Sequence, residues 1–494
     1  MLFNSYIFLL GYLPIVLVAF FVLGRWSRTV AAAWLACSSL FFYAWWNPRY
    51  VLLLLASITF NYVCGRTIAR CAQTAAGKRV LTFAVTVNLL LLCYYKYTGF
   101  FLSSMGTWGH APYGLLHIVL PLGISFFTFT QIAFLVDAYR GLAMEYSPVH
   151  YLLFVTYFPH LIAGPILHHK QMMPQFADPE IYRPRLRSIL PGLAFLAIGM
   201  AKKVLLADNL AYYADRLFRG VEVGLHPGPV LAWTGVLAYA FQLYFDFSGY
   251  CDMAIGLSKL FGIDLPVNFD SPYKSVNIVD FWRRWHITLS HFLRDYLYFP
   301  LGGNRKGKVM RYRNLMITML LGGLWHGANW TFVVWGGLHG IYLVINHAWL
   351  AVKQSAFPGW AERSNGLMAR VRGIAATAVT FVSVLLAWVF FRADSFHAAG
   401  VILKGLAFGF RHTSDAPQEV FLWLLFAVSV PVVWLMPNSQ TLVGSMMRKL
   451  EKTEAGLPAG LVWTAAFSLL LGALGGAAIL QISAVPSKFI YFQF

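Results

Sequence analysis

The stretch Leu315–Val334, LMITMLLGGLWHGANWTFVV, carries a single ionisable side chain, His326. A membrane-crossing helix needs about 20 mostly apolar residues, and this run has that length. A helix from the charged Arg313 to His326 would be about 20 Å long, so we expect His326 deep inside a bilayer core about 30 Å thick. A titratable group at that depth is costly and by default indicates function.

Glycines surround this histidine: Gly322 and Gly323 precede it and Gly327 follows it. They leave room for a ligand beside the ring. The alternative is a structural histidine that bonds to a neighbouring helix, and we favour function because of the glycines.

The whole chain is rich in apolar residues. It is 59% hydrophobic and 12% charged, against about 25% charged residues in a soluble domain. Long apolar runs predict helices rather than a barrel. We therefore predict an all-α polytopic membrane protein with about eleven transmembrane helices, built as a single domain over residues 1–494. The run 149–167, interrupted by Pro159, Gly164 and Pro165, is predicted to be re-entrant.

The formal charge of +19 comes from 38 basic and 19 acidic residues. The loops 65–79 and 301–314 contain basic residues and no acid, whereas 102–117 has neither Lys nor Arg. The positive-inside rule places the first two, and the basic segment 353–372, in the cytoplasm, and it places 102–117 and the N-terminus outside. Topology thus explains the charge without nucleic-acid binding.

A second unusual histidine, His286, lies in a segment, 265–300, that mixes charged and aromatic residues. Such a segment cannot face lipid, so it lies in the interface plane or dips into a protein-lined cavity. On a single helix, His286, Ser290 and the stretch Asp280–Arg284 would place polar groups on neighbouring turns. A surface helix anchored by tryptophans is the alternative, and we favour function because His326 lies nearby in the chain.

Asp246 lies at the end of an apolar run, where an acid usually needs a partner. It could orient a catalytic histidine. The alternative, which we favour, is a structural ion pair with Arg283, Arg284 or Arg294.

Metal chemistry is not indicated. No His-Glu-x-x-His motif occurs, and the five cysteines are scattered without a Cys-x-x-Cys pair. No Walker-type phosphate loop and no nucleophile elbow occur.

Residues 268–307 and 313–329, with 158–166 and 238–256, resemble the membrane-bound O-acyltransferases, in particular the bacterial alginate O-acetyltransferase type. The motif core spans 150–345. The resemblance implies helices around a central funnel, with an acyl group taken from a cytosolic thioester and delivered across the membrane. It implies that His326 is the essential histidine and that His286 matches a second one.

The resemblance also implies acetyl-CoA or another acetyl thioester as donor substrate, no bound cofactor, and the bacterial inner membrane as location. Implied partners are periplasmic acetyl-accepting transferases and an exopolysaccharide synthesis or secretion complex. The polymer stays open between alginate, cellulose and another polysaccharide.

A neutral imidazole can act as general base, a role worth about 10² to 10⁴ in rate, and burial favours that neutral form. Trp325 and Asn329 could donate to the thioester carbonyl. The remaining candidates for substrate binding are Arg283, Arg284, Ser290 and Asp246.

A rival hypothesis is a transporter or flippase for a lipid-linked sugar or an ion, which also needs polar groups within the membrane. Many transporters contain inverted repeats with paired broken helices, and the sequence shows no such symmetry. A purely structural subunit of a secretion complex would leave two buried histidines unexplained.

Overall fold

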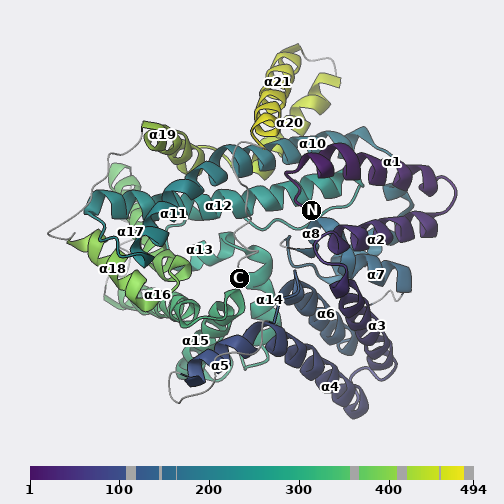
Figure 1. The fold of residues 1–494 in the computed structure, drawn as a ribbon, viewed down its shortest axis with the longest axis horizontal. Helices are drawn as coiled ribbons and strands as arrows, with labels where there is room; N and C mark the ends of the chain where they lie inside the picture. Colours follow the sequence, from purple (N-terminus) through teal and green to yellow (C-terminus); the bar gives the residue numbers. More distant parts are fainter. Residues whose placement is uncertain are drawn as a thin grey trace. The chain divides into compact units, whose positions relative to one another are not determined.

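A computed structural model describes residues 1–106, 118–143, 147–162, 164–356, 366–408, 420–454 and 458–482. The described residues form helices and no strand, which confirms the all-α prediction (Figure 1). Most of the loop 102–117 and the middle of 353–372 lie outside the described residues.

The chain forms two compact units. The first comprises Met1–Ala201, Gly249–Pro266 and Val443–Ala484, and the second comprises Lys202–Ser248 and Val267–Leu442. Helices α12 (Pro229–Leu260) and α20 (Ser439–Glu454) contribute to both. The prediction of a single domain stays a prediction.

The first unit contains the helices of the N-terminal part of the chain and the last described helix. These are α1 (Leu13–Gly24), α2 (Arg28–Ala44), α3 (Arg49–Arg70), α4 (Ala75–Leu92), α5 (Thr98–Gly106), α6 (Ile124–Tyr139), α7 (Pro148–Thr156), α8 (Phe158–Leu161), α9 (His169–Ala177), α10 (Leu186–Met200) and α21 (Pro458–Gln481). Short π or 3-10 turns are η1 (Ile7–Tyr12), η2 (Cys93–Tyr97) and η3 (Pro179–Tyr182). The interruption between α7 and α8 lies where prolines predicted a broken helix.

Buried amides join the helices of this unit. Asn61 on α3 and Asn88 on α4 exchange side-chain hydrogen bonds of 3.1 and 2.7 Å, and Gln131 on α6 donates to Ser57 at 3.0 Å. Polar side chains buried in an apolar environment need such partners, and the bonds fix which faces of the helices meet.

The second unit contains the residues singled out from the sequence. Its helices are α11 (Asp208–Glu222), α13 (Ile278–Arg284), α14 (Ile287–Leu293), α15 (Gly307–His326), α16 (Trp330–Ala356), α17 (Leu367–Arg392), α18 (Phe396–Ala407) and α19 (Val420–Trp434). Its π and 3-10 turns are η4 (Ala201–Ala207), η5 (Pro272–Lys274) and η6 (Arg294–Tyr298).

Six helices among the described residues are long and apolar enough to cross a membrane, or seven if α19 and α20, bent by 69°, form one span. The six are Ile7–Gly24, Arg49–Arg70, Ala75–Gly106, Leu186–Glu222, Pro229–Leu260 and Leu367–Arg392. A protein that crosses the membrane several times is therefore confirmed, while the count of about eleven spans stays a prediction.

Helices α15 and α16 pack closely because glycines face each other. A Cβ on Gly323 would lie 2.2 Å from the carbonyl oxygen of Phe332, and one on Gly336 would lie 2.2 Å from that of Met319. The predicted continuous span 315–334 is wrong, since α15 ends at His326 and α16 begins at Trp330. Gly327 is extended, with φ −157° and ψ 145°, and this ends the helix.

Candidate active site

His326 is the last residue of α15, and aromatic side chains surround it. The residue is 4% exposed. The ring centroids of Trp325, Trp335 and Phe391 lie 4.9, 5.1 and 5.3 Å from that of its imidazole. The imidazole is therefore enclosed by aromatic side chains.

His286 joins α13 to α14 in a strained conformation. Its φ of 44° and ψ of 54° lie in the left-handed region, which costs a non-glycine residue about 1 to 2 kcal/mol. Two backbone hydrogen bonds of 3.0 Å, from Asp270 to Arg284 and from Ile287 to Asn268, hold the chain on either side. The expected single helix through Asp280, Arg284 and Ser290 is therefore wrong, because His286 separates two short helices.

Asn268 determines which nitrogen of His286 carries the proton. Its Oδ1 accepts from the Thr288 backbone N–H at 3.2 Å and from the Thr288 hydroxyl at 3.0 Å, so this atom is the amide oxygen. The same oxygen lies 3.2 Å from His286 Nδ1. An oxygen that only accepts requires Nδ1–H, which leaves the basic lone pair of the ring on Nε2.

The two histidines lie close together. Their ring centroids are 6.3 Å apart, and Phe247 packs against His286 at 4.8 Å. A ring nitrogen lies roughly 1 Å from its centroid and a hydrogen bond is about 2.8 Å long, so one hydroxyl oxygen can bridge rings up to about 8 Å apart. The pair is thus placed to hold a reacting hydroxyl group.

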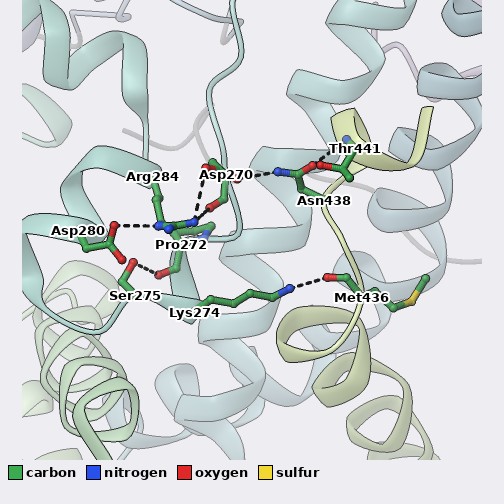
Figure 2. A network of polar contacts seen from close by, with 9 residues as sticks. All are labelled: Asp270, Pro272, Lys274, Ser275, Asp280, Arg284, Met436, Asn438 and Thr441. Atoms are coloured by element: carbon green, nitrogen blue, oxygen red, sulfur yellow. Dashed lines mark hydrogen bonds and ion pairs between the residues drawn. The ribbon is translucent and has the colours of Figure 1, made fainter. Parts of the chain in front are cut away.

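Arg284 anchors the chain before His286 in a polar network (Figure 2). It donates to Asp280 at 2.9 Å and to the Asp270 carbonyl at 3.2 Å. Asn438, before α20, donates to Asp270 at 2.6 Å, and Lys274 donates to the Met436 carbonyl at 2.6 Å. Burial, together with the nearby Arg284, lowers the pKa of Lys274. The network therefore fixes the segment that leads to His286.

Asp246 forms a buried ion pair, but its partner is Lys203 rather than one of the predicted arginines. Lys203 Nζ lies 2.5 Å from Asp246 and 2.6 Å from Asp208, and all these side chains are at most 5% exposed. The expected partners are engaged elsewhere: Arg284 with Asp280 and Arg294 with Asp295. The bond joins residues distant in the chain, so no local pattern predicted it.

The other residues that the sequence predicted to bind substrate mostly contact neighbouring parts of the chain or lie exposed. The Asn329 amide accepts from the Thr331 backbone N–H at 3.1 Å and donates to the Asp394 carbonyl at 3.0 Å, so it shapes the loop beside His326. Arg283 is exposed, and the Ser290 hydroxyl donates to the Trp285 carbonyl at 3.4 Å. Trp325 is buried, its ring 6.2 Å from that of His286. Their predicted substrate contacts stay predictions.

Sequence reasoning missed two residues of this region. Asn268 gave no signal of its own, because an amide acquires its role only through the residues that it meets. His339, however, lies in the apolar run 335–350 and met the criterion that singled out His326, a titratable group within an apolar helix.

Comparison with known proteins identifies the group to which these features belong. The model of the membrane-bound O-acyltransferase family matches residues 40–388. The chain belongs to this family. The predicted resemblance is confirmed, and the protein is an acyltransferase.

Two similar proteins cover most of this O-acyltransferase, and a third covers about half of it. A peptidoglycan O-acetyltransferase of Helicobacter pylori is 43% identical over 82% of this chain and 80% of its own length. A probable alginate O-acetylase of Pseudomonas putida is 38% identical over 100% of both chains. A teichoic acid D-alanyltransferase of Streptococcus thermophilus is 32% identical over 47% of this chain and 58% of its own.

Proposed function

We propose that this acyltransferase moves an acetyl group from a cytosolic thioester across the membrane for O-acetylation of an exported polysaccharide. The observation that carries the proposal is the buried pair His286 and His326, 6.3 Å apart, within a chain of this family. The relatives named as O-acetyltransferases of peptidoglycan and alginate support an acetyl group and a polysaccharide.

The reaction joins a hydroxyl to the acetyl carbon and releases a thiol. A neutral imidazole, for which we propose His326, removes the hydroxyl proton as the oxygen attacks the thioester carbonyl. The carbon–sulfur bond breaks, and the same proton returns to the leaving thiolate. His286, whose basic nitrogen Asn268 sets, holds the hydroxyl in place or shares the proton.

The donor is acetyl-CoA or another acetyl thioester, which acts as a substrate and not as a resident cofactor. The basic loop before α15 supports a cytoplasmic donor side by the positive-inside rule, and by the same rule we propose a periplasmic N-terminus. Periplasmic transferases would receive the acetyl group, within an exopolysaccharide secretion complex in the inner membrane.

Replacement of the proposed base tests this function. We expect His326→Ala to abolish polymer acetylation while the protein is still inserted and folded, as judged by its amount in the membrane and its thermal unfolding. His397→Ala, an exposed histidine on α18, is the matched control and should retain activity. Normal acetylation by His326→Ala would remove this residue from the mechanism.

The acceptor polymer needs its own measurement. The peptidoglycan relative adds the cell-wall polymer to the alginate or cellulose predicted from the sequence. Mass analysis of peptidoglycan and of secreted polysaccharide, from cells with and without the protein, identifies the acceptor by the acetyl groups that disappear.

A transporter without covalent chemistry is the rival, and the family match weighs against it. Purified protein given labelled acetyl-CoA separates the two. Transfer or hydrolysis of the label supports the enzyme, whereas binding without turnover supports transport.

A further inference from the structure

The corner between α19 and α20 comprises residues 434–439, and the two helices are bent by 69° across it. It lies beyond residues 40–388, the part of the chain that the family model matches. Its hydrogen bonds nevertheless join it to residues between 161 and 237 positions earlier in the chain, around His286. A segment outside the family match thus contacts the surroundings of the proposed site.

Asn438 contacts the loop that leads to His286 (Figure 2). Its amide nitrogen donates to Asp270 Oδ1 at 2.6 Å, and its amide oxygen accepts from the Thr441 backbone N–H at 2.8 Å. A hydrogen bond to a charged acceptor is about twice as strong as one between neutral groups. Asp270 is bonded in turn to the backbone of Arg284, two residues before His286. The bond from Asn438 therefore restrains the chain directly before the strained histidine.

Two more hydrogen bonds join the corner to the same loop. Trp434 Nε1 donates to the Tyr273 carbonyl at 3.1 Å, and Lys274 Nζ donates to the Met436 carbonyl at 2.6 Å. The ring of Tyr273 stacks on that of Trp285, with their centroids 6.0 Å apart. Since Trp285 directly precedes the strained histidine, these bonds hold the loop at a second point.

A further contact of the corner leads to α12. Lys202 donates to the Ser439 hydroxyl at 2.7 Å. Its neighbour Lys203 forms the buried ion pair with Asp246. Phe247, the next residue along α12, packs against the ring of the strained histidine at 4.8 Å. The corner is thus connected to that ring from the side of α12 as well as through the loop.

We propose that Asn438 is a positioning residue for His286, an inference that rests on the proposed function. It acts through Asp270 and Arg284, and it holds the loop so that the ring of His286 lies beside that of His326. A misplacement of about 1 Å can cost an enzyme about 10² in rate. Loss of this bond should therefore lower kcat and leave the KM for the donor unchanged.

A purely structural role as the N-cap of α20 is the competing explanation. An N-cap side chain accepts from a backbone N–H two or three positions on, as Asn438 does from Thr441, and Asn, Asp and Ser all do this well. Asn438→Asp keeps that acceptor. It replaces the donating nitrogen, 2.6 Å from the Asp270 oxygen, with a second carboxylate oxygen. This substitution therefore separates the contact with Asp270 from the helix cap.

Rates of transfer or hydrolysis of labelled acetyl-CoA by the purified protein test the proposal. We expect Asn438→Asp to lower kcat about ten- to hundredfold and to leave KM unchanged. Adding Asp270→Asn exchanges the donor and the acceptor, so the hydrogen bond forms again and most of kcat should return. Thr74→Ala, which removes the cap of α4 at the Gly77 N–H, is the control and should change neither constant. A wild-type kcat in Asn438→Asp, or no recovery in the double variant, would overturn the proposal.

Hydrogen exchange, followed by mass spectrometry, separates this inference from the proposed function because it needs no turnover. We expect the backbone amides of residues 268–286 to exchange faster in Asn438→Asp and to regain protection in the double variant. Unchanged exchange, or faster exchange with a wild-type kcat, would contradict a positioning role. Faster exchange in the variant, when even the wild-type protein transfers no acetyl group, would instead remove the proposed function and leave the contact of Asn438 with the loop in place.

Discussion

Asn268 allows the sharpest test of how the site is arranged, because one oxygen atom accepts three hydrogen bonds. Asn268→Ala leaves the Thr288 N–H and the His286 Nδ1–H without that acceptor, a cost of about 1 to 3 kcal/mol for each buried donor. It also frees His286 to carry its proton on the wrong nitrogen. We expect kcat to fall by about 10² or more, the scale of general-base catalysis, with little change in KM for the donor.

Asn268→Asp separates the tautomer from simple loss of stability. Its carboxylate keeps an acceptor at the same place, so Nδ1–H is retained and most of the activity should return above neutral pH. A carboxylate also stabilises the protonated imidazole, so the acid limb of the pH–rate profile should move to higher pH.

The control is Asn314→Ala, at a fully buried amide that donates to the Gly303 carbonyl at 3.1 Å. It should lower thermal stability and leave the shape of the pH profile unchanged. The reasoning fails if Asn268→Ala keeps the wild-type kcat, or if Asn268→Asp is as damaged as Asn268→Ala.

Two further predictions concern packing and buried charge. Gly323→Ala should lower the thermal unfolding temperature in detergent, because its Cβ would lie 2.2 Å from a backbone oxygen of α16. Gly337→Ala is the control and should have little effect, because the nearest atom to its added Cβ lies 3.4 Å away. Equal effects of the two substitutions would contradict the close packing of α15 and α16. Lys203→Met should lower the free energy of unfolding by about 3 to 5 kcal/mol, because it leaves buried carboxylates without their cation. Adding Asp208→Asn and Asp246→Asn to this variant should restore much of the lost stability in the same unfolding assay.

The sequence predicted the helical fold, which the structure confirms, and it singled out the two histidines as candidates, because both signals are local. An apolar run predicts its own helix, and an ionisable residue within it stands out without knowledge of its neighbours. The ion-pair and hydrogen-bond partners of a residue cannot be predicted from such local signals. Lys203 and Asp246 lie on different helices, and Asn268 meets His286 only after the intervening chain has folded back.

The break at His286 shows a second limit of local signals. Neither glycine nor proline occurs between Asp280 and Ser290, so the sequence predicts one helix across a residue that the structure holds at a φ of 44°. A glycine there would remove the strain but would also remove the imidazole. The hydrogen bonds of Asn268 and the backbone pairing of Asp270 with Arg284 offset the strain. Backbone strain is retained here where a ring must face His326, and strain of this kind clusters at functional sites.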